Sequence, residues 1–297
     1  MFHRSVLLQE SIDALAINKA GIYVDATFGG GGHSKEILKY LDEGKLLGFD
    51  QDADAIENAI NDPRFTMVNS NFRYIKNFLK LYRSVPVDGI LADLGISSHQ
   101  IDVPERGFST RFDAELDMRM DQRGKLMAKD VLNTYSEERL AMVFNEYGEI
   151  RNAMKVARMI GAQRKVKPVA TTGELKELLM PFAVRGRENK YFAQVFQALR
   201  IEVNKEMEAL KEFLLQSTEV LKPGGRLVVI SYHSLEDKLV KNFFRSGKFT
   251  GDAEKDFYGN LITPLRVVNR KPIVAGEAEV SENPRARSGR LRIAEKV

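Results

Sequence analysis

Three aspartates stand where an apolar run gives way to a polar or glycine-rich segment: Asp25, Asp50 and Asp93. The runs before them have the length and composition of buried β-strands. Asp25 is followed by four consecutive glycines at 29–32 and then by Ser34, which we expect to cap the next helix. Glycines allow a close approach of the backbone and positive φ angles. A glycine loop between a strand and a helix N-terminus therefore predicts a nucleotide-binding site.

The carboxylates indicate which kind of nucleotide fits this site. Carboxylates accept hydrogen bonds from ribose hydroxyls or from an ammonium group, and they would repel a pyrophosphate. The aromatic ring of Phe72, just past the third predicted strand, can stack on an adenine. A cationic ligand that carries an adenosine fits this combination best, and S-adenosylmethionine has this chemistry.

Two other nucleotide motifs are excluded by single positions. A P-loop requires Gly-Lys followed by Ser or Thr, whereas the Gly-Lys pairs at 44/45, 124/125 and 247/248 are followed by Leu or Phe. The dinucleotide fingerprint requires a third glycine at position 34, which is Ser34 here. An NAD-dependent oxidoreductase is thereby disfavoured, and it remains one rival hypothesis.

The pattern around these residues predicts strands that alternate with helices, which implies a parallel sheet with right-handed crossovers. We expect strands at 22–25, 45–50, 65–68, 87–94 and 226–231. We expect helices at 5–17 and 53–60, a helix that carries Ile75 and Leu79, one long helical run over 191–220, and a helix capped by Ser234. From about residue 262 we expect an extended, basic tail.

The strand pattern stops between about 103 and 190, where three helical patterns occur instead. Leu140, Val143, Phe144 and Tyr147 have helical spacing, 151–160 has an apolar stripe, and 171–174 is a capping box. We therefore expect a methyl-donor-binding domain formed by residues 1–102 and 191–297, with 103–190 as an inserted helical domain for substrate recognition.

Composition narrows the classes of function. The chain has no cysteine, which excludes disulfides and thiolate chemistry, and its four histidines lack the spacing of metal ligands, so we expect no metal site. Its net charge of +4 and pI near 9.0 are compatible with a polyanionic partner. No apolar run has membrane-spanning length, and we expect a soluble cytoplasmic protein.

Six blocks occur in order along nearly the whole chain, and together they resemble the bacterial 16S ribosomal RNA cytosine-N4 methyltransferases. They lie at 25–34, 93–98, 106–109, 116–121, 233–237 and 283–288. The resemblance implies a Rossmann-like class I methyltransferase sheet in an α/β fold with an inserted all-helical subdomain. It also implies S-adenosylmethionine-dependent methylation of the N4 amine of a cytosine in the decoding centre. The cofactor contacts that it implies are at Gly31, Gly32, His33, Asp50, Phe72, Asp93 and Gln100.

The partner implied by the resemblance is 16S ribosomal RNA within the small ribosomal subunit. Several clusters of cations could bind its phosphates: Arg151, Lys155, Arg158, Arg164, Lys165 and Lys167, the loop 185–190, and Arg285, Arg287, Arg290 and Arg292. One departure concerns position 194, where many relatives carry Arg and this chain has Gln194. Lys190 and Arg200 are candidates to replace that arginine.

No catalytic side chain is assigned from the sequence. Fixing the geometry of the cytosine amine can supply much of the rate, so strong acid–base chemistry is not required. His233 is a conceivable general base, although a packed or capping histidine is the better interpretation. A non-catalytic RNA-binding assembly factor is the second rival hypothesis. Oligomeric state, and the choice between naked RNA and an assembled subunit as substrate, stay open.

Overall fold

The computed structural model describes residues 5–251, 253–259 and 261–297, and its chain divides into two compact units. The sheet unit comprises 1–95 and 207–297, and the helical unit comprises 96–206. The sequence placed these divisions at 102/103 and 190/191. The first division falls earlier because Ile96 packs against the core of the helical unit. The second falls later because α9 (Glu188–Asn204) packs its buried face into the same core.

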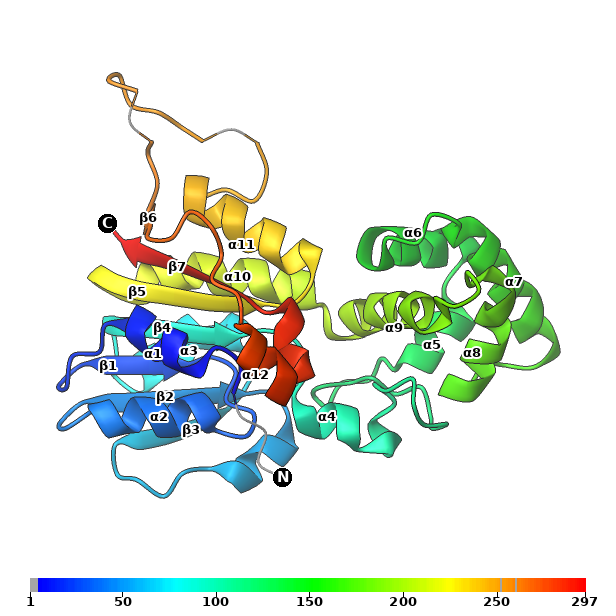
Figure 1. The fold of residues 1–297 in the computed structure, drawn as a ribbon, viewed down its shortest axis with the longest axis horizontal. Coiled ribbons are helices and arrows are strands. Elements are labelled where there is room, and N and C mark those ends of the chain that lie inside the picture. Colours follow the sequence, from blue (N-terminus) through cyan, green and yellow to red (C-terminus); the bar gives the residue numbers. More distant parts are fainter. Residues whose placement is uncertain (1–4, 252, 260) are drawn as a thin grey trace. The chain divides into compact units, whose positions relative to one another are not determined.

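The sheet unit contains one seven-stranded sheet in the order β3-β2-β1-β4-β5-β7-β6 (Figure 1). The first five strands pair in parallel, as expected, whereas β7 is antiparallel to both β5 and β6. This arrangement agrees with the Rossmann-like sheet that the sequence resemblance implies. Its strands are β1 (Ile22–Asp25), β2 (Lys45–Asp50), β3 (Phe65–Asn69), β4 (Val87–Asp93), β5 (Leu221–Ser231), β6 (Leu265–Val267) and β7 (Arg290–Lys296).

Successive side chains of a strand point to opposite faces of the sheet. Because buried residues occur on both faces, helices cover both of them. Leu91 joins a core with Leu15 of α1 and Ile37 of α2, while its equally buried neighbours Ile90 and Ala92 point to the opposite face. The α-helices of this unit are α1 (Leu8–Leu15), α2 (Gly32–Tyr40), α3 (Ile75–Leu81), α10 (Glu206–Val220), α11 (Ser234–Ser246) and α12 (Glu277–Glu282). Its 3-10 helices are Ala53–Asn58, Phe72–Tyr74 and Pro284–Ser288.

The helical unit has its own apolar core, in which Phe144, Val156, Leu175 and Phe196 are buried. The capping box at Thr171 forms as predicted, with Glu174 returning its carboxylate to the backbone. The unit comprises α4 (Ser98–Asp102), α5 (Ala128–Thr134), α6 (Glu137–Gly148), α7 (Ala153–Val166), α8 (Thr172–Leu179) and α9 (Glu188–Asn204), with 3-10 helices at Pro104–Arg106 and Met180–Phe182.

Several expected elements differ in the structure. The run over 191–220 is two helices, because Lys205 adopts φ 50° and ends α9 in a left-handed cap. In the segment 53–60, residues Ala53–Asn58 form a 3-10 helix, which ends before Pro63. β5 begins at Leu221 rather than at Arg226, and a bulge with Gly224 at φ 78° interrupts its pairing with β4. The expected extended tail contains α12 between two strands.

Candidate functional site

The three aspartates lie at the carboxyl ends of neighbouring strands. Asp25 ends β1, which lies between β2, ended by Asp50, and β4, ended by Asp93. The carboxylates are close enough for Asp25 to raise the pKa of both Asp50 and Asp93 electrostatically. The sheet thus brings together three groups that are 25 and 43 positions apart in sequence.

Each of these carboxyl groups has a raised pKa, and burial is the largest cause. The pKa of Asp25, of Asp50 and of Asp93 is raised to about 6. Hydrogen bonds oppose this effect, because backbone N–H groups and hydroxyls favour the charged form. Near neutral pH the site therefore presents closely spaced negative charges that favour a cationic ligand.

The glycine loop is fastened to the end of β2. Gly29 has φ 51°, and its N–H donates a 2.8 Å hydrogen bond to Oδ2 of Asp50. Gly31 has φ 74°, and an added Cβ there would lie 2.8 Å from the ring of Phe28. At Gly32 an added Cβ would meet Ser5 Oγ, whereas at Gly30 it would meet no atom within 4 Å. Of the glycines at 30–32, Gly30 is thus the one that leaves open space for a ligand at the loop.

The expected role of Ser34 is corrected by the structure. The helix begins at Gly32 with Gly31 as its N-cap, so Ser34 lies inside α2 and does not cap it. Its buried Oγ instead donates a 2.7 Å hydrogen bond to Oδ2 of Asp25. Thr27 N also donates to Asp25, at 3.2 Å. Asp25 thereby ties the end of β1 to α2 and to the start of the glycine loop.

His33 is buried beside Asp93. Its Nε2 lies 3.2 Å from the carbonyl oxygen of Val6, and its Nδ1 lies 3.9 Å from Oδ2 of Asp93. A carbonyl can only accept a hydrogen bond, so Nε2 carries the hydrogen and Nδ1 is directed at the carboxyl group. Burial lowers the pKa of His33, although Asp93 opposes this effect. The ring is held in a fixed orientation between the N-terminal segment and β4.

Asp93 is held by a residue that the sequence reasoning missed. The hydroxyl of Tyr232, directly after β5, donates a 2.7 Å hydrogen bond to Oδ1 of Asp93. The backbone N–H of Asp93 donates to Oγ1 of Thr27 at 2.6 Å. Burial and the nearby Asp93 raise the pKa of Tyr232, so its hydroxyl stays protonated. Its position at the carboxyl end of a central strand was the available signal.

Phe72 begins the 3-10 helix after β3 and is half-buried. Its ring packs edge to face on Phe213 of α10, with centroids 5.1 Å apart. The preceding Asn71 donates to the side chain of Gln51 at 2.7 Å, which joins this segment to the loop that follows Asp50. The structure therefore places Phe72 on the segment next to the end of β2.

Gln100 belongs to the helical unit, where it is buried on α4. Its backbone N–H donates to Ser97 Oγ at 3.2 Å, and its side-chain oxygen accepts from Ser97 N at 3.1 Å. The two residues thus form a capping box. The part of Gln100 in cofactor binding stays a prediction.

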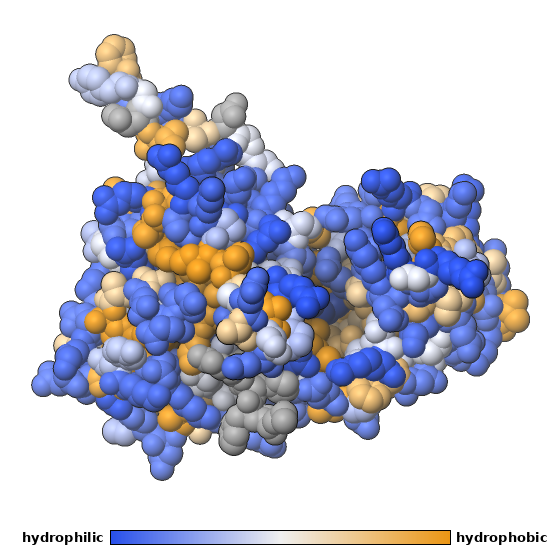
Figure 2. All heavy atoms as spheres, in the orientation of Figure 1, coloured by the Kyte–Doolittle hydropathy of each residue, from blue (hydrophilic) through white to orange (hydrophobic). Residues whose placement is uncertain are grey.

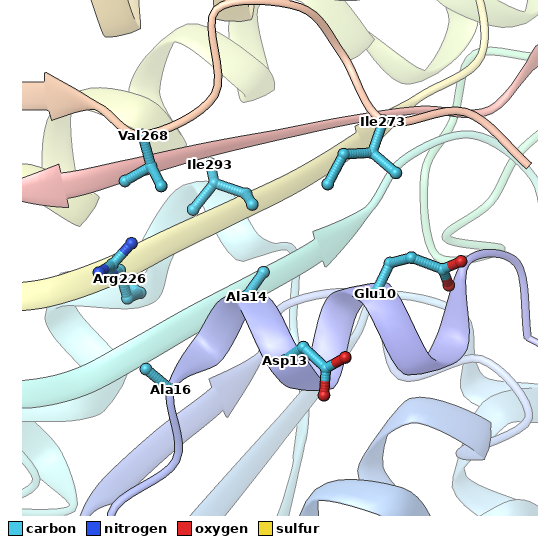
Figure 3. Close-up of a pocket in the computed structure, with 8 residues that line it drawn as sticks. All are labelled: Glu10, Asp13, Ala14, Ala16, Arg226, Val268, Ile273 and Ile293. Carbon is cyan, nitrogen blue, oxygen red and sulfur yellow. The ribbon is translucent and has the colours of Figure 1, made fainter.

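The described residues also form a separate pocket of about 350 Å³ in the sheet unit (Figure 3). It lies between α1 and strands β5 and β7, on the face of the sheet rather than at the carboxyl ends of the strands. None of the predicted site residues lines it. Its lining residues are Glu10, Asp13, Ala14, Ala16, Arg226, Val268, Ile273 and Ile293.

His233 caps a helix, which confirms the interpretation preferred from the sequence over that of a general base. The sequence predicts Ser234 as this cap, and the structure places His233 there instead. It is the N-cap of α11, and its Nδ1 accepts from Glu236 N at 3.4 Å. Glu236 completes the capping box, because its carboxylate accepts from the backbone N–H of His233 at 3.4 Å, and it also accepts from Tyr232 N at 2.9 Å. The residue therefore positions the start of α11 beside the end of β5.

Several of the candidate phosphate-binding cations are already engaged within their own unit. Arg164 donates to the carbonyls of Leu132 and Tyr135, and Lys167 pairs with Glu174. In the sheet unit, Arg292 and Arg290 both bind the carboxylate of Asp237, whose pKa is lowered by these arginines. Arg200 forms a two-point ion pair with Glu206, at 2.8 and 2.9 Å.

The described part of the chain contains no helix that is both long and apolar enough to cross a membrane. In Figure 2 hydrophilic residues dominate the visible surface, and apolar residues are scattered among them.

Comparisons with known proteins give full-length matches. A family model described as the MraW methylase family matches residues 1–297. A "Ribosomal RNA small subunit methyltransferase H" from Christiangramia forsetii is 57% identical over 100% of this chain and 98% of its own length. A protein of the same name from Bacteroides fragilis is 59% identical over 99% of this chain and 97% of its own length. Another, from Cytophaga hutchinsonii, is 59% identical over 100% of both chains.

Proposed function

The chain belongs to the MraW methylase family, and from this membership we infer that it is an S-adenosylmethionine-dependent methyltransferase of small-subunit ribosomal RNA. The acceptor that we propose is the N4 amine of a cytosine in the decoding centre of 16S RNA. The observation that carries the proposal is the full-length identity of 57–59% with relatives named as small-subunit ribosomal RNA methyltransferases. The site in the sheet unit supplies the chemistry that this reaction needs.

The residues at the strand ends fit the methyl donor. Gly30 leaves open space at the loop, so a ligand can approach the backbone there. Carboxylates at Asp50 and Asp93 suit ribose hydroxyls and a cationic amino-acid part, and the ring of Phe72 suits an adenine. We propose that Gly31, Gly32, His33, Asp50, Phe72 and Asp93 hold the donor together with Gln100. When bound, S-adenosylmethionine supplies an electrophilic methyl group.

The protein's own residues contribute orientation. Tyr232 holds one oxygen of the Asp93 carboxyl group by a hydrogen bond, His33 Nδ1 lies 3.9 Å from the other oxygen, and Thr27 holds its backbone. A group held in this way can accept a hydrogen bond in one direction without reorganising. The amine of cytosine is a weak nucleophile because its lone pair is delocalised into the ring. Fixing its N–H groups and its approach is therefore the main contribution required of the protein. The target base must also be unstacked before it can react.

The decisive experiment is mass spectrometry of small-subunit RNA after incubation with the protein and isotopically labelled S-adenosylmethionine. We expect one cytosine to gain one labelled methyl group on its exocyclic amine. Naked RNA and assembled small subunits should be tested side by side, because the proposal covers both. Unmodified RNA in both arms, with the protein shown to bind the cofactor, would refute the enzymatic role and favour a non-catalytic binding protein. Action in the cytoplasm stays a prediction.

A further inference from the structure

The helical unit carries cations of two kinds, and the structure separates them. Some pair with a carboxylate within the unit, among them Arg119 with Asp117, Lys129 with Glu115 and Arg139 with Glu202. Another group is exposed and forms no ion pair with any described residue. We name as the free-cation surface the members of this group that lie on two neighbouring segments: Arg151, Lys155, Arg158 and Lys165, and Arg185, Arg187 and Lys190.

The first four residues follow one side of α7. Arg158 lies three positions after Lys155, and Lys165 lies seven positions after Arg158, which places the three residues on one helical face. Arg151 directly precedes the N-cap residue of the helix. At 1.5 Å per residue, Lys155 and Lys165 are about 15 Å apart along the axis. The opposite side of α7, which includes Val156 and Ile160, is buried in the unit's core. The helix is thus apolar inside and cationic outside.

The other three residues lie where α9 begins, and a hydrogen bond joins the two segments. The hydroxyl of Tyr191, the residue after Lys190, donates to Oδ1 of Asn152 at 3.0 Å. Asn152 is the N-cap residue of α7 and directly follows Arg151. The cations before α9 and those at the start of α7 therefore form one continuous surface.

Glu188 and Glu138 lie near this surface, and neither forms an ion pair with its cations. Glu188 accepts a 2.9 Å hydrogen bond from the backbone N–H of Gly186, so it is engaged with its own loop. Glu138 of α6 is near enough to Arg158 for the cation to help lower its pKa, but backbone and Ser136 hydrogen bonds lower it more. Neither of these two acids neutralises a cation of the surface through an ion pair.

We propose that the free-cation surface binds the phosphate backbone of the RNA substrate and thereby sets the affinity of the enzyme for RNA. The inference rests on the proposed function for the identity of the partner. Arginines and lysines that already pair with carboxylates would lose those pairs on binding a phosphate, whereas the seven free cations lose none. Lys190 and Arg200 are the two candidates to replace the arginine that relatives carry at position 194. Arg200 is paired with Glu206, so of these two candidates only Lys190 belongs to the free-cation surface.

The test compares two variants with the same change of charge. The first carries Arg151→Gln, Lys155→Gln, Arg158→Gln and Lys165→Gln. The control carries Lys45→Gln, Lys80→Gln, Lys211→Gln and Lys241→Gln, four exposed lysines of the sheet unit for which no ion pair is found among the described residues. Affinity for purified small-subunit RNA is measured by fluorescence anisotropy between 50 and 300 mM salt. Circular dichroism and thermal unfolding verify that both variants are folded.

We expect the first variant to lose about tenfold to 100-fold in affinity at 150 mM salt. We also expect the slope of log K against log salt to become shallower by about 0.7–0.9 for each phosphate that the variant no longer neutralises. The control should stay within about threefold of the wild type, as expected for four charges that touch no phosphate. Equal losses in both variants would mean that only net charge matters, and no loss in the first would mean that the RNA lies elsewhere. Either result overturns the proposal.

Steady-state methyl transfer, measured over a range of RNA concentrations that reaches saturation, separates this inference from the proposed function. If the wild type does not methylate RNA but binds it through these four residues, the surface stands and the enzymatic function fails. If the wild type methylates RNA and the first variant does so with unchanged KM, the function stands and the surface fails. A rise in KM with little change in kcat is the result expected when both hold.

Discussion

The N–H of Gly29 donates a 2.8 Å hydrogen bond to Oδ2 of Asp50, so the glycine loop after β1 is fastened to the end of β2. One carboxylate therefore shapes the loop, and in the proposed function it also contacts the methyl donor. Asp50 also accepts from Asp52 N at 2.8 Å, which orders the turn after β2. Changes at these strand ends should affect ligand binding and loop geometry to different degrees, and this difference is measurable.

Two glycines of the loop should respond differently to alanine. At Gly31 a Cβ would meet the Phe28 ring and the backbone has φ 74°, so Gly31→Ala should cost about 1–2 kcal/mol of folding stability. At Gly30 a Cβ meets no atom within 4 Å, so Gly30→Ala should leave stability unchanged and weaken cofactor binding by occupying the ligand's space. Chemical denaturation and calorimetric titration with S-adenosylmethionine measure the two effects. Unchanged cofactor affinity in Gly30→Ala would place the ligand away from this loop.

Cofactor binding should depend on pH through Asp50. Its pKa is raised to about 6, so the carboxylate is lost as the pH falls through that value, and with it hydrogen bonds to the ligand. We expect Kd to rise by about tenfold per pH unit below 6 for each proton that must be lost before the ligand binds. In Asp50→Asn binding should be weaker at pH 7.5, and its pH dependence should be reduced. Calorimetry from pH 5 to 8 provides the measurement, and identical profiles in both proteins would contradict it.

Tyr232→Phe should shift a pKa rather than abolish activity. The hydroxyl of Tyr232 lowers the pKa of Asp93 by favouring its charged form, so its loss should raise that pKa. We expect the acidic limb of the pH profile of kcat/KM to move upward by about one unit, which corresponds to one hydrogen bond to a charged group. Tyr258→Phe, at an exposed position, is the matched control. A uniform fall in rate with an unmoved limb would indicate a packing role instead.

Ser34→Ala should destabilise the fold more at pH 7.5 than at pH 4.5. The hydroxyl compensates a buried carboxylate, and the pKa of Asp25 is about 6, so the charge that needs compensation is present only at the higher pH. We expect a loss of about 1–3 kcal/mol at pH 7.5. The control is Ser11→Ala, where an equally buried hydroxyl bonds to the carbonyl of Leu7 and no charge is involved. Equal pH dependence of the two variants in urea denaturation would refute the account.

His233→Asn should retain most of the activity and stability, because Asn is a favoured N-cap residue and can accept from Glu236 N. His233→Leu removes the cap and should lower stability by about 1 kcal/mol. Thermal unfolding and steady-state rates distinguish the two variants. If His233→Asn lost activity by orders of magnitude while binding both substrates normally, the histidine would be a proton acceptor rather than a cap.

The sequence predicts some features of this molecule better than others. The ends of β2 and the cap at Thr171 follow from local chemistry, since an apolar run and a capping box need only neighbouring residues. The break between α9 and α10 has no such local signal, because Lys205 carries a left-handed φ that its residue type does not predict. The roles of Ser34 and Tyr232 depend on aspartates at other strand ends, so only the assembled sheet reveals them.

The antiparallel strand β7 has a consequence for how the protein is made. It lies inside the sheet, between β5 and β6, yet residues 290–296 are the last strand of the chain. A ribosome delivers this strand after every other strand of the sheet, and β7 is the neighbour with which β6 pairs among the described residues. The sheet therefore stays incomplete until residues 290–296 have been synthesised, so a chain truncated before residue 290 should lack β7 and leave the edge of β5 unpaired and prone to aggregation.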